Sequence, residues 1–518
     1  MEHEELPEHF NAAAFFVDRH LLDGSAGRTA FRCGGRSVTY GEVAAAANRC
    51  GHALAALGVE IEDRVLLVLD DTPAFAAAFW GAVKVGAVAV PVNTLMTPQE
   101  YEFLLNDSRA KVAVVEASVA ARLLAVRHRC PWLREIVVAG RALAGTLELE
   151  ALLEAAAPSL EPARTFADDV MYWGYTSGST GKPKAAVHSH RDFVAAAELV
   201  GSGIFGITPE DRIFSASKMF FAFGLGNSLY FPARAGATAV LVPERVDAQR
   251  AFEVITAERP TIFFTVPTLY AHMLQVEDAE RFDLSSLRFC VSSGEALPPA
   301  IFDAWAERFG LELVEVVGST EVLHDFIANR PGAARRGVCG RVVPGFEARV
   351  VDDAGAPVPP GTVGHLLVSG PTTSPYYWNR VERTRATMQG AWLRTGDMFC
   401  EDADGFFVFA GRSDDMLKVS GMWVSPAEVE AQLAAHPAVL EAGVVAARDI
   451  DGLTRARAFV VLKAGWTASS DLAATLTEFV RRRGAGHKAP AFVEFVDDLP
   501  KTATGKVQRF RLRASEPA

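Results

Sequence analysis

Short runs of β-branched and aromatic residues alternate with longer amphipathic segments from about residue 37 to residue 326. Apolar runs without polar alternation are typical of strands that are buried on both faces. The segments between them, such as 97–106, 247–258 and 298–309, have helical spacing and would cover those faces. The pattern therefore predicts parallel sheets packed between helices. Strands are expected at residues 65–69, 87–92, 111–115, 170–175, 237–242, 262–266, 287–291 and 313–317.

The length of 518 residues exceeds what one hydrophobic core usually serves, so several domains are expected. The predicted fold class is α/β, with two doubly wound parallel-sheet subdomains. After about residue 332, short strand-like runs are separated by glycine and proline residues. This pattern predicts a β-rich subdomain at about 332–413. We assign residues 1–413 to this large N-terminal domain. Residues 414–518 mix helical and strand signals and predict a small α+β C-terminal domain.

The charge balance argues against polyanionic partners. Lys and Arg number 51 against 63 Asp and Glu, which gives a net charge of −12, and no basic stripe offsets it. A nucleic-acid backbone or an anionic membrane surface is therefore an unfavourable partner. We expect any phosphate to be bound locally.

Targeting signals and cysteine usage favour the cytoplasm. The first five residues are acidic, and no uncharged apolar run reaches the ~18 residues of a membrane span. The six cysteines are scattered without a C-x-x-C pair, so the sequence signals neither a disulfide framework nor a zinc site. We expect buried thiols.

A loop rich in glycine and hydroxyl residues, YTSGSTGKPK at 175–184, directly follows a predicted strand. Its glycines let backbone N–H groups turn toward an anion, while the hydroxyls and lysines add donors and charge. The spacing differs from that of a P-loop NTPase. A flexible surface loop is the alternative interpretation. The predicted phosphate-binding residues are Thr176, Ser177, Gly178, Ser179, Thr180, Gly181 and Lys184.

Together with further motifs, this loop resembles the adenylate-forming enzymes, which include acyl- and aryl-CoA synthetases, peptide-synthetase adenylation domains and beetle luciferases. The resemblance covers nearly the whole chain. The other motifs are SGEAL at 293–297, VGSTE at 317–321, RTGD at 394–397, GRSDD at 411–415, KVSG at 418–421 and PKTATGK at 500–506.

The resemblance implies ATP, Mg²⁺ and coenzyme A as cofactors, and it implies roles for the matching residues. It places the 176–184 loop over the β- and γ-phosphates, Thr320 on the α-phosphate and Glu321 on Mg²⁺, which prefers hard oxygen ligands. Asp397 would hold the ribose hydroxyls. Glu321 as a residue that merely starts a helix is the alternative. Further nucleotide contacts would come from Ser293, Gly294, Glu295, Ala296, Gly318 and Arg412.

The family also implies two half-reactions separated by rotation of a mobile C-terminal domain. Lys506 resembles the family's catalytic lysine, which bridges carboxylate and α-phosphate during adenylation. Asp414 matches the hinge, and a hinge needs only one residue that can absorb a large φ/ψ change. Gly421 resembles the residue that lines the pantetheine tunnel of coenzyme A after rotation. A solvated lysine and a turn glycine are the alternatives.

Two segments resemble the benzoate–CoA ligase branch, namely KMFFAFGLGN at 218–227 and TEVLHDFIAN at 320–329. Phe221, Ala222 and Phe223 would form a flat apolar wall for an aryl ring, because aromatic contacts add to area burial. Ordinary core aromatics are the alternative. His324 would help to set the carboxylate end of the acid.

Asp325 departs from the branch, whose benzoate ligases carry an aliphatic residue after the matching histidine. A buried carboxylate without a donor costs about 1–3 kcal/mol or more, so Asp325 would favour a ring that bears an amine. The preferred substrate is therefore 2-aminobenzoate (anthranilate), with benzoate and hydroxybenzoates as alternatives. Otherwise, Asp325 would face away and pair with Arg330 or another cation.

Coenzyme A is the expected acceptor, because the chain ends at Ala518 without a carrier domain. A stand-alone enzyme that loads a separate carrier protein is an alternative. A non-catalytic nucleotide-binding protein is disfavoured by the joint presence of Glu321, Asp397 and Lys506. The sequence leaves the oligomeric state open, a homodimer included.

Overall fold

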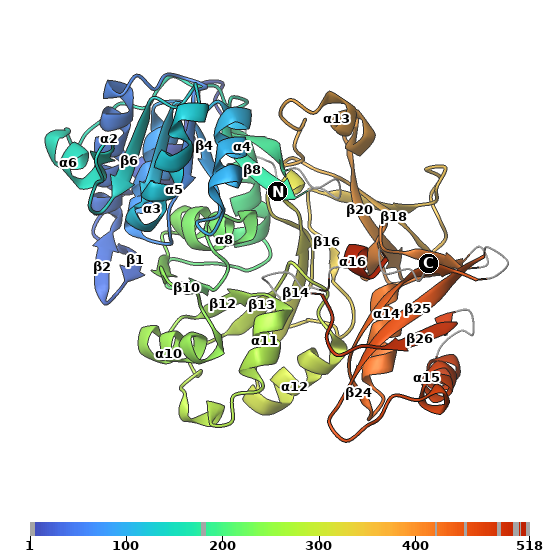
Figure 1. The fold of residues 1–518 in the computed structure, drawn as a ribbon. Helices are drawn as coiled ribbons and strands as arrows, with labels where there is room; N and C mark the ends of the chain where they lie inside the picture. Colours follow the sequence, from blue (N-terminus) through green and yellow to red (C-terminus); the bar gives the residue numbers. More distant parts are fainter. Residues whose placement is uncertain are drawn as a thin grey trace. The chain divides into compact units, whose positions relative to one another are not determined.

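The computed structural model describes residues 6–177, 183–419, 422–449, 453–483, 488–500, 507 and 509–513. Two units, coloured along the sequence in Figure 1, divide the chain. Unit 1 comprises residues 1–347 and 368–393, and unit 2 comprises residues 348–367 and 394–518. Within the described residues, no helix is long and apolar enough to cross a membrane.

The first sheet of unit 1 has seven strands in the order β7-β6-β5-β3-β4-β8-β9. All neighbouring pairs are parallel except β8 and β9, which form an antiparallel pair on either side of the predicted phosphate loop. The strands are β3 (Arg64–Val68), β4 (Val88–Pro91), β5 (Val112–Glu116), β6 (Glu135–Ala139), β7 (Leu147–Glu148), β8 (Val170–Ser177) and β9 (Pro183–Ser189).

The second sheet has nine strands in the order β16-β15-β14-β13-β12-β10-β11-β1-β2. Its centre, from β14 to β1, is parallel, and antiparallel strands extend both ends. The strands are β1 (Thr29–Cys33), β2 (Arg36–Thr39), β10 (Arg212–Ser215), β11 (Thr238–Leu241), β12 (Ile262–Thr265), β13 (Phe289–Ser292), β14 (Leu313–Gly318), β15 (Asp325–Ala328) and β16 (Arg341–Val342).

Helices bury apolar side chains against both sheets. Tyr101 and Leu123, on α4 (Pro98–Ser108) and α5 (Ala117–Val126), belong to the core of the first sheet. In the second, Phe252, Tyr270 and Trp305 come from α10 (Ala248–Glu258), α11 (Pro267–Met273) and α12 (Pro299–Phe309). This burial removes apolar surface from water, the main driving force for folding.

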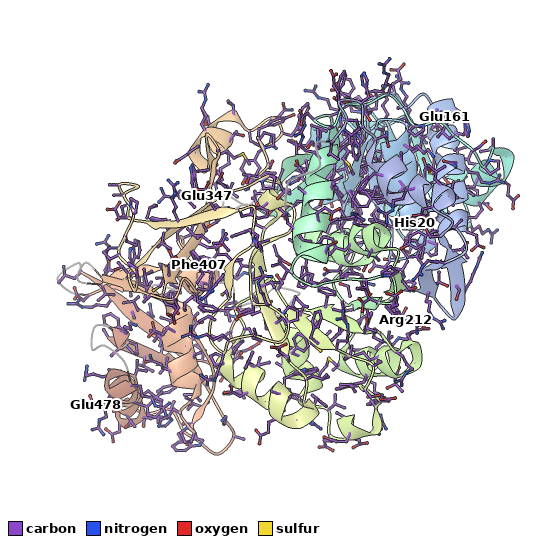
Figure 2. The ribbon with its side chains drawn as sticks, turned by 180° about the vertical axis from the view of Figure 1, so that it is seen from behind. His20, Glu161, Arg212, Glu347, Phe407 and Glu478 are labelled. Atoms are coloured by element: carbon purple, nitrogen blue, oxygen red, sulfur yellow. The ribbon has the colours of Figure 1, made fainter. Side chains whose placement is uncertain are left out.

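His20 is a core residue of unit 1, labelled in Figure 2. It lies on α1 (Arg19–Leu22) and stacks on Tyr40, at the start of α2 (Tyr40–Ala56), with ring centroids 3.8 Å apart. Its Nε2 donates to the Ala233 carbonyl over 2.9 Å. Burial lowers the pKa of His20, so this histidine stays neutral and serves packing.

Unit 2 contains most of a five-stranded sheet and a separate α/β layer. The first sheet is built from β17 (Glu347–Val351), β18 (Val363–Ser369), β19 (Met388–Gln389), β20 (Trp392–Glu401) and β21 (Phe407–Arg412). A hairpin of β22 (Leu417–Val419) and β23 (Met422–Val424) follows. The last layer packs α14 (Pro426–Ala434) and α15 (Ser470–Arg483) on β24 (Val439–Arg448), β25 (Thr454–Leu462) and β26 (Phe492–Phe495). The short α16 (Arg509–Arg513) ends the described chain.

The α/β prediction, with parallel sheets, a β-rich part and an α+β C-terminal part, is confirmed. Most of the strands that were not predicted are only two to four residues long, too brief to stand out in the sequence. The missed strands are β1, β2, β6, β7, β9, β10, β15, β16, β19, β20, β22 and β23. The division into units groups residues 348–367 with the C-terminal part, and the domain boundary after residue 413 stays a prediction. All six cysteines are free thiols, four of them buried.

Candidate functional site

Glu321 is held at the carboxyl end of β14, on the short 3₁₀ helix η6 (Thr320–Val322). Its Oε1 accepts hydrogen bonds from Lys184 Nζ over 2.8 Å and from the Tyr377 hydroxyl over 2.7 Å. The Lys184 ammonium also lies 3.6 Å from the centre of the Tyr377 ring, a cation–π contact. These contacts fix the carboxylate in one orientation.

The charge of Glu321 depends on Lys184. Burial raises the pKa of Glu321, but the Lys184 ammonium and its hydrogen bond lower it further, so the net pKa lies below the ordinary value. The carboxylate is ionised at neutral pH.

Such a group fits Mg²⁺, which binds through one or two carboxylates together with phosphate oxygens and water. Both hydrogen bonds that the Glu321 side chain accepts from the described residues use Oε1, so Oε2 could bind a cation. Among the described residues, no group of three metal-ligating side chains exists. Binding of Mg²⁺ by Glu321 together with the phosphates of ATP stays a prediction.

Thr320 is anchored through its backbone. His188, a buried residue of β9, donates from Nε2 to the Thr320 carbonyl over 2.8 Å. Its Nδ1 lies 3.0 Å from Asp192 Oδ2, on α7 (His190–Ala196). The His188–Asp192 pair therefore orients η6, and the sequence did not predict this role for either residue. The only sequence signal is the i, i+4 spacing of His188 and Asp192.

The 293–297 segment directly follows β13, next to the end of β14. Ser293 Oγ donates to the Val316 carbonyl over 3.2 Å, and Glu295 accepts from Thr268 Oγ1 over 2.8 Å. The predicted residues Ser293, Gly294, Glu295 and Ala296 thus form one loop at the carboxyl edge of the sheet. This is where ligands bind in open parallel sheets.

Glu315 is a second residue that the sequence reasoning missed. It is buried on β14, and its Oε1 accepts from the backbone N–H of Leu297 over 3.1 Å, with the Cys339 thiol 3.5 Å away. Burial raises the pKa of Glu315 to about 7. Glu315 therefore ties down the end of the 293–297 segment.

His324 lies at the centre of a group of aromatic rings. Its ring centroid lies 5.5 Å from that of Phe223 and 4.5 Å from that of Phe231, and its Nε2 lies 3.3 Å from the Phe223 carbonyl. Gly226 makes this packing possible, because a Cβ there would lie 2.5 Å from His324 Nε2. The structure thus brings Phe223 and His324 together as predicted.

The predicted apolar wall is only partly assembled. Ala222 is buried next to Phe223, on α8 (Ala222–Leu225). Phe221, in contrast, is 51% exposed, and its ring packs edge-on against Phe220 at 4.7 Å. The contact of Phe221 with a bound ring stays a prediction.

Asp325 is buried, with a side chain only 1% exposed. Its Oδ1 lies 3.4 Å from Ser293 Oγ. Its Oδ2 lies 3.0 Å from His324 Nδ1, but not in hydrogen-bonding geometry, and neither atom has a hydrogen-bond partner among the described residues. Arg330 donates instead to the Gly203 carbonyl. The alternative of an Asp325–Arg330 pair is therefore wrong.

Gly318 lies against Asp325. A Cβ at this position would be 2.6 Å from Asp325 Oδ1 and 2.7 Å from the His324 carbonyl. Gly318 is thus required for the close approach of β14 and β15, and its predicted contact with the nucleotide stays a prediction.

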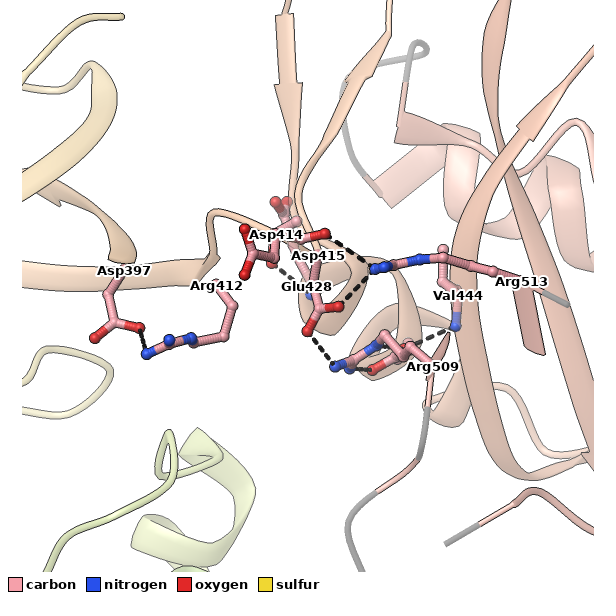
Figure 3. A network of polar contacts seen from close by, with 10 residues as sticks. Asp397, Arg412, Asp414, Asp415, Glu428, Val444, Arg509 and Arg513 are labelled. Atoms are coloured by element: carbon pink, nitrogen blue, oxygen red, sulfur yellow. Dashed lines mark hydrogen bonds and ion pairs between the residues drawn. The ribbon is translucent and has the colours of Figure 1, made fainter. Parts of the chain in front are cut away.

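Asp397 and Arg412 face each other in unit 2, on the paired strands β20 and β21. Arg412 Nη1 donates to Asp397 Oδ1 over 2.7 Å, as Figure 3 shows. A carboxylate can accept more than one hydrogen bond, and binding of the ribose by Asp397 stays a prediction.

The predicted hinge residue Asp414 follows this pair (Figure 3). The Asp414 carbonyl accepts a hydrogen bond from Arg513 Nη2 over 3.1 Å. Arg513 Nη2 also donates to Asp415 Oδ1 over 2.6 Å. Arg509 links Asp415 to Glu430. These ion pairs connect the residues after β21 with the end of the described chain.

Thr176 pairs with Lys184 across β8 and β9, so both lie where the phosphate loop leaves the sheet. The backbone of Ser177 ends β8. Six further predicted residues lie outside the described residues, namely Gly178, Ser179, Thr180, Gly181, Gly421 and Lys506.

Comparison with known proteins decides the family. A model of the AMP-binding enzyme family matches residues 19–378, and a model of the AMP-binding enzyme C-terminal domain matches residues 428–506. The chain belongs to the AMP-binding, or adenylate-forming, enzyme family. Within the family it belongs to the benzoate–CoA ligase branch.

Three relatives illustrate this branch. A benzoate–CoA ligase of Thauera aromatica is 46% identical over 99% of this chain and 97% of its own length. A crystal structure of the anthranilate CoA ligase AuaEII in complex with anthranoyl-AMP has a TM-score of 0.92 at 41% identity and covers 99% of both chains. A benzoate CoA ligase from Burkholderia xenovorans LB400 has a TM-score of 0.86 at 44% identity, covering 97% of this chain and 100% of that one.

Lys184→Met should slow adenylate formation by ~10²–10³-fold, a loss typical of one preorganised charged donor. Without the ammonium, burial raises the pKa of Glu321, so a smaller fraction of the carboxyl is ionised at a given pH. The rate of the variant should therefore recover partly as the pH rises. Carboxylate-dependent pyrophosphate exchange from pH 6 to 9 measures both effects.

The control is Lys111→Met, which removes another partly buried lysine of unit 1, paired with Asp63. It should keep the wild-type rate. A Lys184→Met rate equal to that of the control would contradict the role of Lys184.

Glu315 should make stability depend on pH. Its folded-state pKa of about 7 lies above the ordinary 4.5, so its stabilising contribution is complete below pH 4.5 and is lost as the pH rises to about 7. The loss amounts to roughly 3 kcal/mol, at about 1.4 kcal/mol per pKa unit. Glu315→Gln keeps an acceptor for Leu297 and should be less sensitive to pH than the wild type. Urea unfolding at pH 5 and pH 7.5 checks this.

Glu312→Gln is the control, because Glu312 also accepts backbone hydrogen bonds, from Gly332 and Ala334. It should retain the pH dependence of the wild type. If Glu315→Gln retained it as well, the assignment to Glu315 would be wrong.

Proposed function

We propose that the chain is an AMP-forming aryl–CoA ligase that activates 2-aminobenzoate and transfers it to coenzyme A. The observation that carries the choice of acid is the buried Oδ2 of Asp325, which has no hydrogen-bond partner among the described residues. The similarity to the anthranilate CoA ligase AuaEII supports the same choice.

The proposed reaction has two steps. In the first, a carboxylate oxygen of the acid attacks the α-phosphorus of ATP, a new P–O bond forms, and the bond to pyrophosphate breaks. In the second, the thiol sulfur of coenzyme A attacks the acyl carbon, loses its proton and displaces AMP. Negative charge develops on phosphoryl oxygens in the first step, where preorganised cations and donors are most effective.

The described residues suit the first step. Glu321, kept ionised by Lys184, would hold Mg²⁺, which offsets phosphate charge when it is bound. Thr320, anchored by His188, would donate to the α-phosphate. The 293–297 segment, anchored by Glu315, would lie along adenine, and Asp397 would bind the ribose.

The amine of 2-aminobenzoate would satisfy Asp325. An aryl amine is neutral at pH 7, so the contact is a hydrogen bond without an ion pair, typically worth about 1.5 kcal/mol. Benzoate offers no donor at that position. A benzoate–CoA ligase is nevertheless the second candidate, because the 46% identical relative from Thauera aromatica bears that name. Hydroxybenzoates follow, since a hydroxyl can also donate.

The remaining assignments are part of the same proposal. Lys506 would serve adenylation, Asp414 would be the hinge for rotation of the C-terminal domain, and Gly421 would line the coenzyme A tunnel. A separate carrier protein is the alternative acceptor, and a homodimer is a further proposal. We place the enzyme in the cytoplasm, supported by six cysteines that are all free thiols.

Pyrophosphate release across a set of acids tests the proposal. The set comprises 2-aminobenzoate, benzoate, the hydroxybenzoates and short fatty acids. We expect the highest kcat/KM with 2-aminobenzoate, and aryl-CoA as the product once coenzyme A is added. Preference for benzoate would select the second candidate. Preference for fatty acids would contradict both.

Asp325→Ile should raise kcat/KM for benzoate relative to 2-aminobenzoate by ~10-fold or more, which corresponds to ~1.4 kcal/mol. The substitution removes the acceptor and its desolvation cost together. The ratio of the two kcat/KM values is the quantity to measure, because a packing defect would depress both alike. An unchanged ratio would remove the reason for preferring 2-aminobenzoate.

Lys506→Ala should separate the two half-reactions. Loss of its ammonium should slow adenylate formation by ~10²–10³-fold, while a supplied aryl-adenylate should still be converted to the thioester. The matched control is Lys501→Ala, from the same PKTATGK motif, which should leave both steps intact. Equal loss of both steps in Lys506→Ala would refute the assignment.

A further inference from the structure

A pair of opposite charges, a buried Asp71 and a partly buried Lys218, lies next to the segment that forms the predicted apolar wall. Asp71, in the loop after β3, is 2% exposed, and Lys218 follows β10. Lys218 Nζ lies 3.9 Å from Asp71 Oδ2. The other oxygen, Oδ1, accepts from the backbone N–H of Met219 over 3.0 Å. Asp71 thus contacts both the side chain and the backbone at the start of the wall segment.

The ammonium of Lys218 is further tied to the loop after β11. It donates to the carbonyls of Val242, Pro243 and Glu244, the last two over 3.0 and 2.7 Å. Because β3 belongs to the first sheet and β10 and β11 to the second, the pair joins the carboxyl ends of strands from two sheets. Residues 218 and 219 are therefore held both by the loop after β3 and by the loop after β11.

A tight turn at residues 218–224 connects Lys218 with the residues that contact His324. The Lys218 carbonyl accepts from the backbone N–H of Phe221 over 3.0 Å. Gly224 packs so closely on the same carbonyl that a Cβ there would lie 2.1 Å from the oxygen. Between these contacts lies Phe223, whose carbonyl and ring contact His324. A shift of Lys218 would therefore displace the residues that face His324.

We propose that Asp71 and Lys218 are positioning residues for the aromatic acid, which hold the 219–223 turn in the conformation that accepts the ring. The inference rests on the proposed function and assigns no contact with substrate to either residue. Binding groups must be held within a fraction of an ångström to act, and the pair supplies that constraint at a distance.

The two charges depend on each other. Burial raises the pKa of Asp71 to about 6, while the Lys218 charge and the Met219 N–H oppose that rise. Removal of Lys218 would raise the pKa of Asp71 further, so a smaller fraction of its carboxyl would be ionised. Each single variant should therefore weaken the same Asp71–Lys218 contact. The double variant should raise the KM for the aromatic acid little beyond the effect of either single variant.

The experiment compares Lys218→Met, Asp71→Asn and the double variant in full-length protein by pyrophosphate release. Asp71→Asn keeps an acceptor for Met219, which favours folding. We expect the KM for the aromatic acid to rise about 10-fold or more in each variant, because small displacements of binding groups have large effects. The KM for ATP should stay within about twofold.

Lys84→Met is the matched control. It breaks another partly buried pair of unit 1, in which Lys84 Nζ donates to Asp18 Oδ1 over 2.7 Å. A purely structural loss in the control should lower the melting temperature without changing the ratio of the two KM values. Asp71 and Lys218 variants that behaved like this control, or that kept the wild-type KM for the acid, would overturn the proposal.

The wild-type acid profile separates this proposal from the proposed function. If the wild type prefers benzoate, the choice of 2-aminobenzoate fails, and the KM comparison is made with benzoate. A wild type that activated no aromatic carboxylate would overturn both.

Discussion

Neighbouring parallel strands end at the same edge of a sheet, and this constraint gathers the candidate site of unit 1. The segment after β13 carries Ser293, and the segment after β14 carries Thr320 and Glu321. Lys184 reaches Glu321 from β9, on the other sheet. The chemistry therefore depends on strand order and register more than on any single contact.

Buried charge is the second organising principle. Burial destabilises the charged form of a carboxyl group, and different neighbours offset this effect at Glu321, Asp71 and Glu315. Glu321 has a nearby ammonium, which keeps it ionised. Asp71 has a more distant one and a raised pKa, while Glu315 has only backbone and thiol donors and a pKa of about 7. The distance to a cation therefore separates the ionised Glu321, proposed to bind Mg²⁺, from the two carboxyls with raised pKa values.

Much of the fold followed from local pattern, because long apolar runs and helical spacing are visible in the sequence. The positions of Thr320, Glu321 and Lys184 were accessible because short motifs surround them. Tyr377, His188 and Glu315 were not, since their roles arise only when distant segments meet. Phe223 contacts His324, but its part in the predicted wall stays a prediction, and the pattern could not reveal that Phe221 would be half exposed.

The two glycines beside His324 and Asp325 also limit how the acid pocket can diversify. Any side chain at 226 would collide with the His324 ring, and any at 318 with the His324 backbone as well as Asp325. Evolution or engineering cannot enlarge those positions without moving β15. Position 325, in contrast, already holds a side chain, so its exchange for one of similar size adds no such collision. Changes of substrate range in this lineage should therefore accumulate at position 325, while 226 and 318 remain glycine.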